Sequence, residues 1–125
     1  MITGSVTSEL EAVLSIELRG LNGQSQSVRA AIDTGFDGVL ALPEAVMERL
    51  DFPFLGLEKV VLADGSRTVL LTFAATVLWH GKLLRVTAME AEGGALVGMA
   101  LLYGSRLTMD VLEDGPVRIE AVEFS

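Results

Sequence analysis

The chain has 125 residues, half of them hydrophobic, and a mean hydropathy of +0.50, so it is too apolar to be disordered. Nine Lys and Arg against seventeen Asp and Glu give a net charge of −8, which disfavours nucleic acid and anionic membranes as partners. With no cysteine and one histidine, the sequence excludes disulfides, thiolate metal sites, a cysteine nucleophile and a multi-histidine metal cage. We therefore expect no metal and no cofactor, and any catalysis must depend on carboxylates.

Short strands separated by tight turns dominate the predicted secondary structure. In chain order, strands are expected over residues 13–18, 27–32, 39–42, 57–63, 68–78, 83–89, 95–97, 107–112 and 117–122. The Asn22-Gly23 pair is a typical hairpin turn between the first two strands. Pro43 begins a short helix over residues 43–50, in which Val46 and Leu50 face the core, and residues 99–103 form a helical turn. This density of strands indicates an all-β barrel or sandwich, in a single domain of residues 1–125.

No export signal or membrane span is visible in the sequence. Glu9, Glu11 and Glu17 interrupt every apolar run within residues 1–20. The longest nearly uncharged stretch, residues 68–79, is far shorter than the roughly twenty apolar residues of a membrane helix. Together with the absence of cysteine, this pattern predicts a cytoplasmic protein without a membrane partner.

Asp33 follows the apolar end of the strand expected over residues 27–32, and Thr34 and Gly35 come directly after it. Such a strand delivers the carboxylate into a poorly hydrated place, where its charge is costly unless donors surround it or a second carboxylate shares its proton. Gly35 permits a close backbone approach, so its N–H can reach the carboxylate. Thr34 adds a hydroxyl that can bond to backbone across a symmetric contact. This segment is the candidate catalytic site.

The Asp33-Thr34-Gly35 triplet, with small and apolar residues before it and residues 36–40 after it, resembles the active-site motif of retropepsin-like aspartic peptidases. The small one-lobe bacterial and archaeal members are the most similar. In that family, two apolar residues and a glycine cross behind the aspartate loop, and Leu96, Val97 and Gly98 match them. A hairpin flap lies between the two elements and matches residues 60–69. Its tip is expected at Ala63, Asp64, Gly65 and Ser66. The resemblance covers about residues 12–112 and implies a single-lobe acid-protease barrel with one or two short helices.

The resemblance implies an aspartic endopeptidase in which two carboxyls share one proton and activate a water. This chain contains one Asp-Thr-Gly, so the second carboxylate is expected from a second copy in a homodimer. The expected partners are therefore a second copy of the chain and a peptide or protein substrate. Apolar walls at Val39, Leu40 and Val97 are expected to select the substrate.

Other interpretations stay open at particular residues. Many members of the family have Arg and then Asn or Asp after the second glycine, where this chain has Met99 and Ala100. This departure favours the alternative of a catalytically weak or inactive dimeric binding or scaffold module. Trp79 and Tyr103 are expected in the core or at a dimer contact, and His80 in a turn without a partner. Asp64-Gly65 is equally well explained as a simple hairpin turn.

Overall fold

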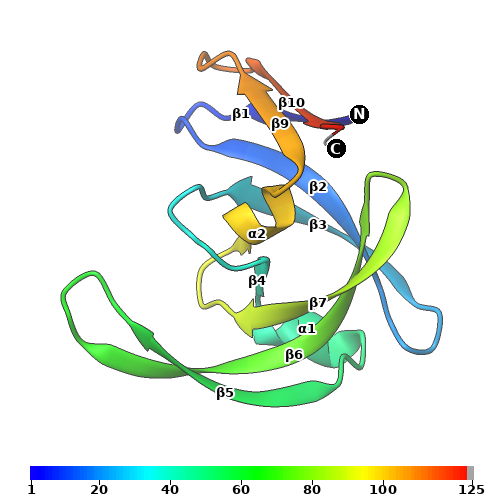
Figure 1. The fold of residues 1–125 in the computed structure, drawn as a ribbon, viewed down its shortest axis with the longest axis vertical. Helices are drawn as coiled ribbons and strands as arrows, with labels where there is room; N and C mark the ends of the chain where they lie inside the picture. The colour runs from blue at the N-terminus through cyan, green and yellow to red at the C-terminus, as the bar shows by residue number, and fades with distance from the viewer. Residues whose placement is uncertain (124–125) are drawn as a thin grey trace.

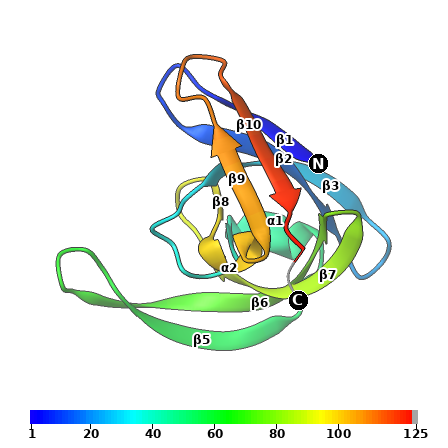
Figure 2. The ribbon, with the colours of Figure 1, turned by 45° about the horizontal axis from the view of Figure 1, so that its top comes forward.

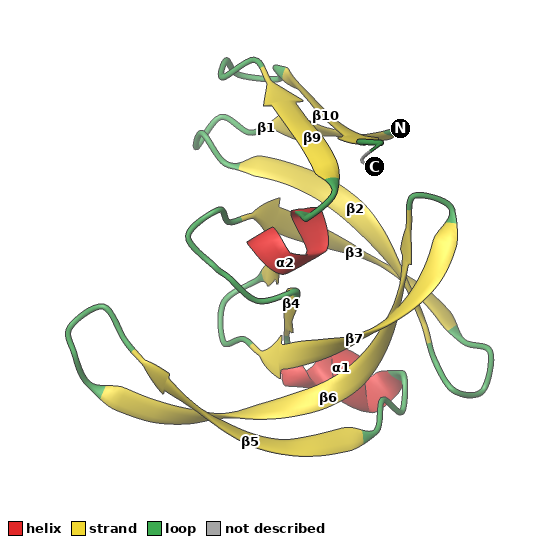
Figure 3. Ribbon diagram, viewed as in Figure 1, coloured by secondary structure: helices red, strands yellow, loops and turns green. Residues whose placement is uncertain are grey.

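Ten strands and two short helices make up the computed structural model, which describes residues 1–123 (Figures 1 and 3). The strands are β1 (Ile2–Val6), β2 (Ala12–Arg19), β3 (Ser25–Ile32), β4 (Leu40–Leu42), β5 (Phe54–Val61), β6 (Arg67–Trp79), β7 (Lys82–Glu90), β8 (Ala95–Val97), β9 (Ser105–Met109) and β10 (Pro116–Ala121). The helices are α1 (Glu44–Arg49) and α2 (Met99–Leu102). Neither of these two helices of the described chain is long and apolar enough to cross a membrane.

Six of the strands close into a barrel. They are hydrogen-bonded in the order β6-β7-β4-β8-β3-β2, and β2 pairs back to β6 through Glu17 with Leu78 and Leu18 with Val77. The β3–β8 and β4–β7 pairs are parallel, whereas the other pairs of the ring are antiparallel. This closed ring confirms the all-β barrel that the sequence predicts.

The core lies inside this barrel and beneath α1. Val46 and Leu50 are buried, as their spacing predicts, and Met47 is fully buried between them. Trp79, only 5% exposed, belongs to the core, whereas Tyr103 is 81% exposed and does not. The largest fully buried side chains are Leu18, Leu40, Leu42, Met47, Leu50, Ile119, Val6, Val77, Val97 and Val117. Removing such apolar surface from water is the main force that holds the barrel together.

Two extensions leave the barrel. The β5–β6 hairpin, which we call the arm, projects beyond the ring to its tip at residues 62–66 (Figure 1). On the other side, β1 pairs with β2 and β10, and β10 pairs with β9. β1 is absent from the predicted elements because its Thr-, Gly- and Ser-containing sequence has little apolar alternation. Gly4 lets β1 approach β2 closely, since a Cβ there would overlap the carbonyl oxygen of Val13.

His80 has a partner, contrary to expectation. It does lie in a turn, with a φ of 49°, next to Gly81 at 77°. Its ring Nε2 lies 2.8 Å from the Ser105 Oγ, which links the β6–β7 turn to the start of β9. The sequence offers no second histidine, but the partner is a hydroxyl that only the folded chain brings near.

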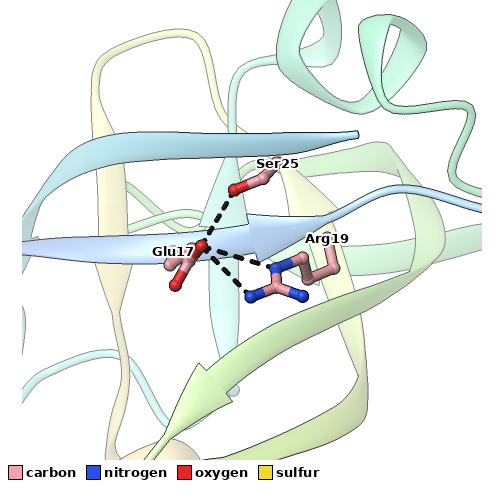
Figure 4. A network of polar contacts seen from close by, with 3 residues as sticks. All are labelled: Glu17, Arg19 and Ser25. Atoms are coloured by element: carbon pink, nitrogen blue, oxygen red, sulfur yellow. Dashed lines mark hydrogen bonds and ion pairs between the residues drawn. The ribbon is translucent and has the colours of Figure 1, made fainter. Parts of the chain in front are cut away.

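A small polar network at the β2–β3 hairpin is remote from the Asp33 segment (Figures 1 and 4). The Ser25 hydroxyl donates to Glu17 Oε1 at 2.8 Å, and the Arg19 guanidinium lies 3.4 Å from the same oxygen. Because both members of the ion pair are partly exposed, it is worth at most about 1 kcal/mol. We assign this network no functional role.

Candidate active site

Asp33 is the first residue after β3, and the backbone of β8 holds it in place. β3 and β8 are parallel, with Ile32 opposite Val97. The Asp33 N–H donates to the Val97 carbonyl at 2.9 Å, and the Asp33 carbonyl accepts the Phe36 N–H at 3.1 Å. Backbone hydrogen bonds therefore fix both the N–H and the carbonyl of Asp33, independently of its side chain.

The Asp33 carboxylate is half-buried and has a backbone donor. The Gly35 N–H donates to Asp33 Oδ1 at 2.9 Å, as the sequence predicts. Thr34 and Gly35 are exposed, so the surface next to the carboxylate is open in the single chain. A carboxylate accepting one backbone N–H has a fixed orientation and keeps acceptor capacity for a water or a second carboxyl.

The Leu96-Val97-Gly98 segment lies against the Asp33 loop, as the sequence predicts. β8 lies between β3 and β4, so Leu96 and Val97 cross directly behind the Asp33 loop, residues 33–39. The Gly98 N–H donates to the Val39 carbonyl at 3.0 Å. Two N–H groups at the start of α2 also donate to this loop, from Met99 to Phe36 at 2.8 Å and from Ala100 to Gly38 at 3.0 Å. Segments more than fifty residues apart in sequence thus form one rigid unit.

Phe36 belongs to this unit but is missing from the predicted site residues. A Cβ at Gly38 would lie 2.5 Å from the Phe36 Cζ, and one at Gly98 would lie 2.6 Å from its Cδ2. The aromatic ring therefore fills the space that the two glycines leave. An aromatic residue between Gly35 and Gly38 is the sequence signal that points to this packing.

The tip of the arm is a self-contained turn at residues 62–66. The Leu62 N–H donates to the Ser66 carbonyl at 2.7 Å, and Gly65 adopts a positive φ of 84°. The Asp64 carboxylate accepts both the Ser66 hydroxyl and the Ser66 N–H, and these hydrogen bonds hold the pKa of Asp64 below its ordinary value. Ala63, Asp64, Gly65 and Ser66 are all exposed. The residue preferences of a tight turn account for this geometry. Figure 1 shows the tip on the same side of the molecule as the Asp33 loop.

A hollow of about 380 Å³ lies beside the Asp33 loop, between it, β5 and β7. Its lining residues are Asp37, Gly38, Val39, Leu40, Glu58, Thr87 and Met89. Val39 is half-buried and suits the predicted wall role. Leu40 lines the hollow although its side chain is fully buried, whereas Val97 is fully buried in the core and is not among the lining residues, so the predicted wall role of Val97 is wrong.

Among residues 1–123, no group of three His, Asp or Glu side chains is placed to hold a metal ion.

Comparison with known proteins identifies the fold. The structure is similar, with a TM-score of 0.60, to the crystal structure of a retropepsin-like aspartic protease from Rickettsia conorii. The match covers 98% of this chain and 91% of that chain, at 16% sequence identity. No family model and no curated protein matches the sequence. The chain therefore has the retropepsin-like fold that its motifs predict.

Proposed function

We propose that this protein is an aspartic endopeptidase, a single-domain enzyme that works as a homodimer in the cytoplasm. The observation that carries the proposal is the placement of Asp33 at the end of β3, with its Oδ1 accepting the Gly35 N–H at 2.9 Å. The Asp-Thr-Gly triplet and the retropepsin-like fold support the same chemistry. Because the chain has one such triplet, the second carboxyl comes from Asp33 of a second copy.

Peptide hydrolysis by this pair requires that the two Asp33 carboxyls share one proton. The ionised carboxyl takes a proton from the attacking water, while the protonated one donates its proton to the scissile carbonyl oxygen. The tetrahedral intermediate then collapses: the carboxyl that took the water proton gives it to the leaving nitrogen, the C–N bond breaks, and the other carboxyl regains its proton from a hydroxyl of the intermediate as the product carboxyl forms. The Gly35 N–H keeps one Asp33 carboxyl oriented throughout, since it can donate to either protonation state.

One face of the arm, which carries three exposed apolar side chains together with Lys59 and Arg67, supports binding of an extended peptide. Leu57, Val61 and Val69 are 67%, 69% and 47% exposed. They lie on one face of the hairpin, because Leu57 pairs with Leu71 and alternate residues share a face. That face continues along β6 through Leu71, which packs against the core. An apolar substrate would cover side chains that water now surrounds.

The proposal is tested by digesting an unbiased peptide mixture between about pH 3 and pH 7, with fragments identified by mass spectrometry. The wild type is compared with Asp33→Asn, and Asp114→Asn makes the same chemical change in an exposed turn between β9 and β10. We expect fragments from the wild type and Asp114→Asn and at least a thousandfold less from Asp33→Asn. The rate should be highest at mildly acidic pH, because the dyad must hold one proton.

A dimeric binding or scaffold module with the same fold is the second candidate. Met99 and Ala100 favour it, because they leave the start of α2 without polar side chains to brace the Asp33 loop. Identical digests from the wild type and Asp33→Asn would support this candidate and reject the enzyme.

A further inference from the structure

A hollow of about 340 Å³ lies between β1 and β2, where the two strands separate. Their register ends at Ser5 with Val13. Beyond that point β1 continues beside β10, as Figure 2 shows, whereas β2 continues toward its pairing with β6. We call this hollow the fork site; its lining residues are Thr3, Gly4, Ser5, Val13, Leu14, Ser15 and Arg29.

Four polar side chains of the fork site lie on the outer face of the sheet. Ser15 is in register with Arg29. Ser5 is in register with Val13, which lies two residues before Ser15. Because alternate residues of a strand share a face, these polar side chains and that of Thr3 lie on one face, and all four are exposed to solvent. One guanidinium and three hydroxyls therefore line the same hollow.

These four side chains have no partner within residues 1–123. The hydroxyls of Thr3, Ser5 and Ser15 form no hydrogen bond in this part of the chain, and the Arg29 guanidinium forms no hydrogen bond or ion pair there. The chain has seventeen acidic residues, yet Glu11, which lines the adjoining hollow together with Arg29, is not within ion-pair distance of it. Arg29 is also the only charged residue that lines the fork site. The donors of the fork site are therefore all available to a ligand.

A second arginine lies beside the hollow on the same face. Arg118 of β10 is opposite Thr3 of β1, is exposed, and has no ion-pair partner among the described residues. The backbones of Arg29 and Arg118 are three strand spacings apart, about 14 Å, and the hollow lies between them. The acidic residues Glu17 and Glu120 on the same face lie beyond this row of residues and do not line the hollow. One cation therefore borders the fork site on each side.

We infer that the fork site binds a phosphate group. A guanidinium donates two parallel hydrogen bonds to two phosphate oxygens, and the remaining oxygen of a monoester accepts hydrogen bonds from the hydroxyls. A carboxylate, with two oxygens and a single charge, would leave most of the hydroxyls without an acceptor. The charge of a phosphate monoester, about −1.5 to −2 at neutral pH, also suits two flanking arginines. The volume of the hollow lies in the range of small-molecule sites, which leaves room for the rest of a small ester.

Titrations of the whole chain followed by proton–nitrogen correlation NMR test the site, with the ionic strength held constant by sodium chloride. The probes are glycerol 3-phosphate, inorganic phosphate and acetate. We expect both phosphates to shift the amide signals of Thr3, Ser15 and Arg29 in a saturable way, and acetate to bind roughly tenfold more weakly or less, because it accepts fewer charge-assisted hydrogen bonds. Tighter binding of glycerol 3-phosphate than of inorganic phosphate assigns the site to an ester, and equal binding assigns it to the free anion; both support a phosphate site.

Two arginine variants make the test specific. Arg29→Gln removes the guanidinium at an exposed position, and we expect the dissociation constant for glycerol 3-phosphate to rise roughly tenfold or more. Arg85→Gln makes the same change at an exposed position of β7, and we expect less than about a twofold rise because a distant surface charge is screened. The same spectra show whether each variant is folded, and Arg29→Lys, which keeps the charge but loses the paired donors, should bind more weakly than the wild type and more tightly than Arg29→Gln. The inference is overturned if neither phosphate shifts the fork-site signals saturably, if acetate binds as well as phosphate, or if Arg29→Gln and Arg85→Gln weaken binding equally.

Discussion

Gly98 and Gly38 pack so closely that a Cβ on Gly98 would overlap the Gly38 carbonyl oxygen. The same carbonyl accepts the Ala100 N–H at 3.0 Å, so it cannot turn away without losing a hydrogen bond. The contact joins the loop that carries Asp33 to the start of α2. Here the requirement for glycine comes from space, since Gly98 has a φ of −100° that any residue can adopt.

We therefore predict that Gly98→Ala destabilises the fold by about 1–3 kcal/mol, the usual cost of forcing extra atoms into a packed site. Gly93→Ala is the matched control, because nothing lies within 4 Å of a Cβ at Gly93. Urea unfolding of both variants measures the free energy of unfolding. Equal stability of Gly98→Ala and Gly93→Ala would show that the loop relaxes freely around Gly98.

Gly35→Ala should lower the activity and leave the stability of the fold nearly unchanged. A Cβ at Gly35 would lie 3.3 Å from Asp33 Oδ1, which displaces the carboxylate by a few tenths of an ångström. Because Gly35 is exposed, we expect the free energy of unfolding to change by less than about 0.5 kcal/mol. We expect kcat/KM to fall roughly tenfold to a hundredfold, since small errors of position are costly in catalysis. An unchanged kcat/KM would mean that the Gly35 contact does not position the reacting group.

Ser66→Ala should raise the pKa of Asp64 toward its ordinary value, because it removes the hydroxyl that lowers this pKa most. A lowered carboxylate pKa stabilises the folded turn above the unfolded-state pKa of about 3.9, and the contribution is lost as pH falls through the folded value. Carboxyl chemical shifts followed by NMR over a pH titration measure the change. Ser66→Thr, which keeps a hydroxyl, should retain the lowered pKa, and a similar rise in both variants would contradict the assignment.

The sequence predicts the structure correctly where a local residue pattern also indicates which segment it meets in the fold. The apolar end of β3 before Asp33, and Leu96-Val97 before Gly98, each predict a short buried strand, and the fold brings them together as expected. Val97 was assigned to the substrate wall wrongly, because an apolar residue beside a site looks the same in sequence whether it faces a ligand or the core. Its side chain is fully buried.

What could not be predicted depends on pairing between distant strands. β1 has little local signal, and the partner of His80 is a serine twenty-five residues away. A hollow beside α2 and β9 also cannot be predicted from the sequence, since Thr34 and Leu107 come to line it only when β9 returns past α2. For the same reason, the family resemblance predicted from the sequence extends only to about residue 112, although β10 lies beyond that point and completes the sheet and the core.

That last segment gives a further prediction. Ile119 in β10 is fully buried in the core, and it pairs with Ile2 of β1 and Leu107 of β9. Ile119→Ala should therefore cost about 2–5 kcal/mol, as for other large buried aliphatic side chains. Arg118→Ala, at an exposed neighbouring position of the same strand, should cost less than about 0.5 kcal/mol. Urea unfolding monitored by the fluorescence of Trp79, which lies in the barrel core, measures both. If Ile119→Ala unfolds with the stability of Arg118→Ala, β10 is an appendage to the barrel rather than part of its core.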